Sequence, residues 1–341
     1  MKLKALTRAA AVVTAVTATA ALGALPAQAA TIGIPWRPTV LTMPSGGGAG
    51  FLTGSDGKGE YSGTFTVNGV TQVVSWRGYG GMPVVHALPA GYEGAKAEDE
   101  NSAGTIVGTS DDWDTMISRT FTLDATGYHI KDVPAGYDRV EGAAINTRGD
   151  VLGRAYKFTG NDSAAVLWRA SGGDPVVIPQ MTDHYYARDL DDDGSILFEG
   201  GSAPTLWKDG VFRQLPEGSF GQVIPYAIRN GVIVGESPTA RTAIRWNTPT
   251  SDPVELAGGA MAIDVSKAGL SVGYVPNSTP ESTVGNSIAW RGTTPGTLLP
   301  ASGHQYFRAQ VAADDGSFAG YAADALSSYG GVPVIWRKSA T

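Results

Sequence analysis

One short motif recurs along most of this chain and limits what the chain can fold into. Two glycines separated by three residues stand in seven copies, 37 to 47 residues apart, although one copy has Phe198 in place of its second glycine. The copies begin at Gly59, Gly104, Gly149, Gly194, Gly231, Gly269 and Gly316. Self-similarity at such a period is typical of repeat architectures, in which each repeat is one supersecondary unit.

Each repeat predicts four short strands. In "AAINTRGDVLG" (residues 143–153), an apolar stretch is followed by a turn at Asn146 to Gly149 and then by a returning strand, since Asn bonds to nearby backbone and Gly accepts positive φ. A third strand carries an aromatic beside a polar residue, as in Trp76-Arg77, and Phe121 is predicted to replace the tryptophan in the second unit. A fourth strand ends near proline, which suits a sheet edge.

A single four-stranded sheet has two faces to bury and is not stable alone. Seven such sheets can bury these faces by packing radially, as the blades of a β-propeller. We therefore expect an all-β, seven-bladed β-propeller of four-stranded antiparallel blades.

The fourth strands are out of phase with the other three. The apolar run Thr39–Pro44 precedes the first complete set, and no such run follows the last set, which ends at Arg337. We therefore predict that residues 39–44 complete the C-terminal blade, which removes an open sheet edge and closes the ring. Trp36-Arg37 would then be a surplus copy of the pair Trp336-Arg337.

The sequence predicts an export signal followed by one domain. Residues 1–29 have a basic start, an apolar stretch and the small-residue cleavage site Ala27-Gln28-Ala29, without an Arg-Arg pair, which favours secretion by the general secretory route. Residues 30–341 are then a single β-propeller domain. Its blades are expected at about residues 46–89, 90–134, 135–179, 180–216, 217–257, 258–300 and 301–341, the last completed by residues 36–44.

Composition excludes several classes of function. The formal net charge is −7, and loss of the basic signal would make the chain more acidic, which disfavours nucleic acid as a partner. No apolar run after the signal is long enough for membrane insertion. The absence of cysteine excludes thiol nucleophiles and cysteine–metal sites. We expect a monomer.

The repeat pattern is Ala-x-x-Ile-Asn-x-x-Gly-x-Val-Val-Gly followed by Ala-x-Leu-Trp. Its closest copies are "AAINTRGDVLGRAY" with "AAVLWR" and "AIDVSKAGLSVGY" with "SIAWR". This pattern resembles the HAF-type extracellular repeats of secreted bacterial proteins, over about residues 36–337. The resemblance implies a secreted bacterial β-propeller, and because its motifs are structural it brings no catalytic residues.

Aromatic residues follow the terminal prolines, in loops that lead to the next inner strand. Flat rings with polar edges suit sugar rings or peptide side chains. The predicted ligand-binding residues are Tyr92, Tyr137, Tyr185, Tyr186, Phe220 and Tyr306. The alternative is that these rings fill gaps between blades.

One loop has the carboxylate spacing of a calcium site. Asp189, Asp191 and Asp193 alternate before a glycine turn, as in loops that wrap Ca²⁺, although Gly200 stands where such a loop has glutamate. Asp191 also occupies the ordinary turn position of the repeat, so turn capping is the alternative. No other cofactor is expected.

Three aspartates share one register, five residues before the first glycine of their repeats: Asp99, Asp189 and Asp264. They would lie on inner strands near the channel, where converging carboxylates bind a cation or act as acid and base. The alternative is that polar groups between the blades satisfy them.

Together these features favour a secreted, non-enzymatic binding protein that presents an aromatic, acidic propeller face to a glycan or polypeptide. We assign no catalytic residue. One alternative is an extracellular hydrolase or lyase that uses carboxylates near the channel, and another is a structural cell-surface module without a small ligand.

Overall fold

The computed structural model describes residues 34–159, 162–179, 186–200, 203–276, 286–324 and 330–338. The predicted signal peptide, residues 1–29, lies outside these residues. Regular structure within the described ranges consists of strands, and no helix there is long and apolar enough to cross a membrane.

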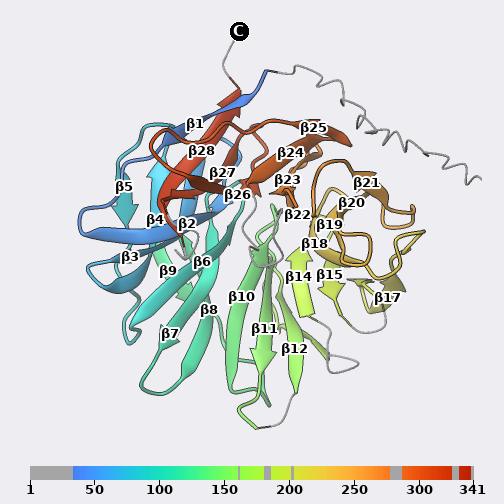
Figure 1. Ribbon diagram of the computed structural model, residues 1–341. Helices are drawn as coiled ribbons and strands as arrows, with labels where there is room; N and C mark the ends of the chain where they lie inside the picture. Colours follow the sequence, from blue (N-terminus) through green and yellow to red (C-terminus); the bar gives the residue numbers. More distant parts are fainter. Residues whose placement is uncertain are drawn as a thin grey trace, which may run out of the picture. The chain divides into compact units, whose positions relative to one another are not determined.

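Seven four-stranded antiparallel sheets are arranged in a ring, so the predicted seven-bladed β-propeller is confirmed (Figure 1). Blades 1 to 3 consist of β2 (Gly47–Ser55), β3 (Glu60–Val67), β4 (Val70–Arg77) and β5 (Pro83–Val85); β6 (Gly94–Glu100), β7 (Ile106–Asp112), β8 (Ile117–Asp124) and β9 (Gly127–Ile130); and β10 (Arg139–Ile145), β11 (Val151–Tyr156), β12 (Ser163–Trp168) and β13 (Val176–Pro179).

Blades 4 to 6 consist of β14 (Tyr186–Leu190), β15 (Ile196–Glu199), β16 (Thr205–Lys208) and β17 (Val211–Gln214); β18 (Ile224–Arg229), β19 (Val232–Ser237), β20 (Thr242–Trp246) and β21 (Val254–Leu256); and β22 (Met261–Val265), β23 (Leu270–Tyr274), β24 (Ser287–Arg291) and β25 (Thr294–Gly296). Blade 7 consists of β26 (Tyr306–Ala312), β27 (Phe318–Ala323), β28 (Val332–Lys338) and β1 (Trp36–Val40).

The N-terminal strand completes the C-terminal blade, as predicted. Figure 1 shows β1, in blue, beside β28, in red, and the two pair antiparallel from Trp36 opposite Lys338 to Val40 opposite Val334. The strand therefore begins and ends earlier than the predicted Thr39–Pro44. The reason is Trp36, which is buried against Phe318 and exchanges backbone hydrogen bonds with Thr297 and Leu299 at the end of blade 6. Trp36 is part of the closing strand and not a surplus copy.

The repeated turn forms as its residues predict. The side-chain oxygen of Asn146 accepts the backbone N–H groups of Arg148 and Asp150 at 3.1 and 2.9 Å, and Gly149 has a φ of 84°. The second glycine of the motif has another role. A Cβ atom at Gly320 would lie 1.8 Å from the carbonyl oxygen of Arg308, so only glycine lets the inner strand pass this close.

Tryptophans of the third strands join neighbouring blades. Four of them are fully buried, and each indole N–H donates to a carbonyl at the end of the preceding blade, at 2.7 to 3.0 Å. These pairs are Trp76 with Thr42, Trp246 with Pro216, Trp290 with Ala257 and Trp336 with Leu299. A buried polar edge with a partner lets a large ring seal the interface without an unsatisfied donor.

Blade 2 departs from this arrangement. Leu123 pairs with Ile106 in the register in which Trp76 pairs with Tyr61, so Leu123 occupies the tryptophan position. The prediction that Phe121 takes this place was wrong by two residues. Phe121 pairs with Gly108, and its ring covers that glycine.

We predict that a disulfide between β1 and β28 will stabilise the ring. Arg37 and Arg337 are exposed and directly opposite each other, and the chain has no cysteine of its own. The double variant Arg37→Cys, Arg337→Cys should form a cross-link on oxidation and gain about 2–4 kcal/mol, because the bond restricts the unfolded chain. Thermal unfolding of the oxidised and reduced forms measures this gain, with each single variant as control. Two titratable thiols after oxidation would show that the strands are not neighbours.

Candidate functional site

Each inner strand has a β-bulge at the same place, and β2 has a second register shift between Gly47 and Gly50. Pairing with the second strand skips one residue in every blade, and a bulge re-aims the side chain of its extra residue. The skipped residues all line one cavity in the channel: Thr53, Glu98, Ala143, Arg188, Tyr226, Ile263 and Gln310. The repeat thus supplies seven channel positions whose residue types are free to differ.

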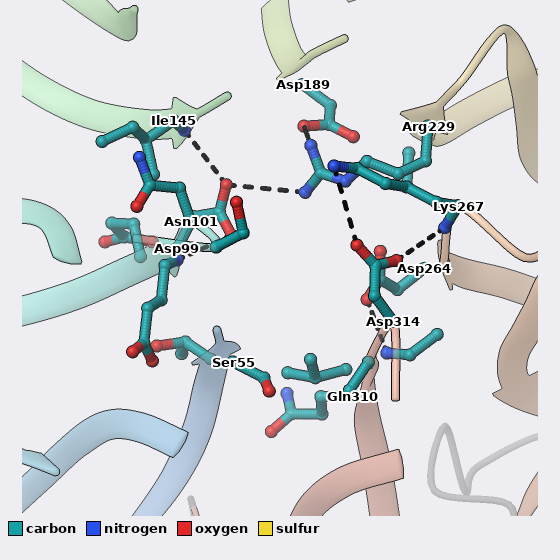
Figure 2. Close-up of a pocket in the computed structure, with 18 of the residues that line it drawn as sticks. Ser55, Asp99, Asn101, Ile145, Asp189, Arg229, Asp264, Lys267, Gln310 and Asp314 are labelled. Carbon is teal, nitrogen blue, oxygen red and sulfur yellow. Dashed lines mark hydrogen bonds and ion pairs between the residues drawn. The ribbon is translucent and has the colours of Figure 1, made fainter. Parts of the chain in front are cut away.

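The cavity measures about 200 Å³ and reaches the end of the channel where the inner strands turn into the second strands. We call this the turn end, and Figure 2 shows its residues. Carboxylates outnumber cations among the lining side chains. They are Asp56, Glu98, Asp99, Glu100, Asp189, Asp192, Asp264 and Asp314, against Arg188, Arg229 and Lys267.

Asp99, Asp189 and Asp264 directly follow bulge residues, in blades 2, 4 and 6. Each carboxylate accepts the N–H of the residue after it and one N–H from the inner strand of the next blade. The donors in the next blade are Ile145, Ile228 and Ala312, at 3.0, 2.7 and 2.7 Å. Each aspartate therefore ties two blades together through the backbone.

One guanidinium lies between these carboxylates. Arg229 is 3.6 Å from Asp99 and 3.9 Å from Asp189, and the charge of Asp264 also acts on it (Figure 2). A single cation cannot neutralise three carboxylates. Burial raises the pKa of Asp99 to about 6 and that of Asp264 to about 7, against the opposing charge of Arg229.

The structure thus brings together the three aspartates that share a register. Their oxygens, however, already accept backbone hydrogen bonds. A carboxylate held in this way is a poor nucleophile or base, because chemistry would break the contact between two blades. This arrangement matches the interpretation in which groups between the blades satisfy the aspartates.

The carboxylates of the proposed calcium loop point to different protein groups. Asp191 accepts the N–H groups of Asn230 and Gly231 at 2.7 and 2.8 Å, while Asp193 pairs with Lys208 at 2.5 Å. Asp189 faces the channel, as described above. Among the residues that the structure describes, no three His, Cys, Asp or Glu side chains are grouped so that they could hold a metal ion.

The predicted aromatic residues that the structure describes lie at the other end of the channel, which we call the loop end. Tyr92, Tyr137 and Phe220 precede inner strands and Tyr306 begins one, whereas Asp99 and its equivalents lie near the ends of such strands. All inner strands run in the same direction around the ring. The single aromatic and acidic mouth expected from the sequence is therefore divided between two ends.

These aromatic side chains are half-buried. Tyr137 packs against the cluster of Val140, Ala155 and Val166. Tyr186 lies between the guanidinium groups of Arg154 and Arg188, at 4.3 and 4.9 Å. Tyr185 lies outside the described residues. The described rings thus pack in part against neighbouring strands, as in the interpretation that they fill gaps between blades, and remain partly exposed.

Sequence reasoning missed two more exposed rings at the loop end. Trp113 and Phe158 are 52% and 55% exposed, and lie in the loops between the second and third strands of blades 2 and 3. The backbone N–H of Trp113 donates to the carboxylate of Glu93, and the backbone N–H of Phe158 donates to the carboxylate of Asp138. These loops lie at the same end of the blades as the loops that carry Tyr92 and Tyr137. The order of the predicted strands could therefore have identified Trp113 and Phe158 as candidates.

Tyr92, Trp113, Tyr137 and Phe158 form what we call the aromatic platform. Arg119 joins its two blades, because it acts electrostatically on Tyr92 and donates to the carbonyl oxygen of Asp138 at 3.3 Å. The platform residues therefore belong to two neighbouring blades, 2 and 3, which Arg119 links at the loop end.

We predict that stability falls as the pH rises from about 5 to 8. Asp99, Asp264, Glu98 and Glu100 have folded-state pKa values of about 6, 7, 7 and 8, all raised by burial. The unfolded chain releases these protons at lower pH than the folded protein does, so each rise in pH favours unfolding. The melting temperature at pH 5 should exceed that at pH 8 by several degrees, since each kcal/mol is worth about 2–4 °C.

Asp264→Asn should reduce this pH dependence because it removes one titrating group. The matched control is Asp192→Asn. Asp192 is partly buried, but hydrogen bonds from Thr147 and Lys267 lower its pKa, so it does not titrate between pH 5 and 8. If the melting temperature falls with pH equally steeply in wild type and Asp264→Asn, Asp264 is not one of the groups that cause the pH dependence.

For calcium, we predict that a chelator leaves the melting temperature unchanged. Asp191 and Asp193 already have protein donors, and a bound ion would have to displace them. A loss of several degrees on adding EDTA, reversed by calcium, would restore this loop as a metal site.

No family model matches the sequence, and no curated protein matches it. The chain is similar to solved structures of low sequence identity. One is oligogalacturonate lyase from Vibrio parahaemolyticus, with a TM-score of 0.59 and 12% identity over 88% of this chain and 92% of that chain. An oligogalacturonate lyase in complex with manganese gives 0.55 at 11% identity, over 89% and 96%.

The β-propeller domain of the Trilobed protease from Pyrococcus furiosus, described as having an open velcro topology, gives 0.53 at 11% identity, over 86% and 97%. At these identities the likeness establishes the fold alone, a β-propeller. The resemblance to HAF-type repeats remains a prediction.

Proposed function

We propose that this chain is a secreted, non-enzymatic binding protein whose aromatic platform binds a glycan. The observation that carries the proposal is the pair of rings of Trp113 and Phe158, each more than half exposed, beside the half-buried Tyr92 and Tyr137. Water solvates exposed aromatic faces poorly, and the apolar face of a sugar ring covers them well. Secretion rests on the predicted signal peptide.

Polar groups surround the rings and suit the hydroxyl groups of a sugar. The ammonium of Lys96 lies 5.3 Å from the centre of the Trp113 ring, and that of Lys157 lies 5.8 Å from the centre of the Tyr137 ring. Glu93 and Asp138 hold the backbone of the two loops and so keep the rings in place. Aromatic faces with fixed polar edges are the usual composition of a carbohydrate-binding surface.

A second candidate is a hydrolase or lyase at the turn end. The convergence of three aspartates on Arg229 favours it, and solved oligogalacturonate lyases share the fold. Against it stand the backbone hydrogen bonds that occupy the aspartates. A structural module without a small ligand is the third candidate, and it would need no exposed Trp113 or Phe158.

The test is a binding screen of the purified protein, residues 30–341, against an array of neutral and uronic-acid-containing oligosaccharides and a panel of synthetic peptides. Trp113→Ala and Phe158→Ala should each weaken binding of the retained oligosaccharide about tenfold or more, as removal of a central aromatic contact does. Met82→Ala is the matched control, because Met82 is 73% exposed in the loop between β4 and β5, at the turn end.

Equal binding by all three variants would exclude the platform. Retention of peptides alone would favour a polypeptide as ligand. Release of shortened or unsaturated sugars during the screen, abolished by Asp264→Asn, would favour the enzyme.

A further inference from the structure

The interface between blades 1 and 2 lacks the ring that closes other interfaces. Leu123 stands in the position of the third-strand tryptophan, and a leucine side chain is shorter than an indole and has no N–H group. In four other blades the indole reaches the end of the preceding blade and donates a hydrogen bond there. Blade 2 cannot make this contact with blade 1.

A cavity of about 410 Å³ lies at this interface. Its walls include Leu123 and Ile106 from blade 2 and His86 and Ala87 from blade 1. His86 and Ala87 directly follow β5, the fourth strand of blade 1, which is the region that an indole contacts in the other blades. We call this cavity the blade 1–2 cleft. Its volume falls within the range of small-molecule sites, about 300–1,000 Å³.

One buried group in the cleft lacks a hydrogen bond. The hydroxyl of Tyr128 is buried and has no partner among the residues that the structure describes. Its ring is fixed edge-to-face against Phe121, with 4.9 Å between ring centres. Leaving such a hydroxyl unpaired costs about 1–3 kcal/mol, so a ligand that pairs with it gains that free energy.

The ionisable groups on the buried inner wall of the cleft, His86 and Glu100, are neutral at pH 7, whereas Glu60, Arg77 and Asp124, which also line the cleft, are at least 40% exposed. His86 shares a hydrogen bond of 2.9 Å with the hydroxyl of Ser75, and burial, with the nearby charge of Arg77, lowers the pKa of His86. Burial raises the pKa of Glu100, which also lines the cleft, to about 8. A neutral ligand therefore suits this wall better than an ion.

We propose that the blade 1–2 cleft binds a neutral, planar aromatic ligand of indole size that carries a hydrogen-bonding group. The ligand takes the place that the blade's own tryptophan fills elsewhere in the ring, and it contacts Leu123 and Ile106 with its faces. Its polar group pairs with the hydroxyl of Tyr128. This site is separate from the aromatic platform and does not depend on the proposed glycan binding.

Indole and N-acetyltryptophanamide are the probes, measured by saturation-transfer NMR and titration calorimetry on the same protein. We expect dissociation constants of about 0.1–1 mM for ligands of this size. Tyr128→Phe should weaken binding about three- to tenfold and should raise the melting temperature of the free protein, because it removes a buried hydroxyl that has no partner. Leu123→Trp should abolish binding and raise the melting temperature, because the new side chain fills the cleft.

Leu123→Met is the matched control and should retain binding, since methionine does not fill the space. Trp113→Ala should also leave indole binding unchanged, which separates this site from the platform. No saturation transfer to wild type at several millimolar indole would overturn the proposal, as would unchanged binding in folded Leu123→Trp. If Leu123→Trp does not fold, equal affinity of Tyr128→Phe and wild type overturns it.

Discussion

The pairing of β1 with β28 is the constraint on which the rest of the molecule depends. Without it blade 7 would end in an open edge, and the interface between blades 7 and 1 would lose Leu41 and the carbonyl that receives the indole of Trp76. The seven inner strands converge on a channel only if the ring is closed. The positions of Asp99 and Arg229, which come from different blades, therefore depend on a strand more than fifty residues away from either.

The motif that defines the repeat predicted the architecture well, because it encodes backbone requirements. Glycine is required where a turn needs positive φ, as at Gly149, and where two strands approach closely, as at Gly320. These requirements fix the glycine positions in each repeat. The offset of the fourth strands predicted the closure for the same reason, since every sheet needs its edge strand. The exact start of β1 was not predictable, because it depends on the packing of Trp36 against blade 6.

The site was less predictable, because it depends on contacts between repeats. The shared register correctly grouped Asp99, Asp189 and Asp264, yet the bulges that turn Glu98 and its equivalents into the channel have no sequence signal beyond the repeat itself. The exposure of the aromatic side chains could not be predicted from the sequence either. Tyr137 was predicted to bind a ligand and is half-buried. Trp113 is a large apolar residue of the kind expected in a core, yet its side chain is half exposed.

The residues that break the repeat are therefore the ones to examine for function. Positions that build the ring must stay nearly constant from blade to blade, since each makes the same turn, bulge or interblade contact. Leu123 at a tryptophan position, Arg229 among three carboxylates, and Trp113 and Phe158 in two neighbouring loops all depart from the pattern that the repeat sets. They lie at three separate places, and only the two rings share a surface. A seven-fold scaffold with different residues at equivalent positions can hold more than one ligand site without a change of fold.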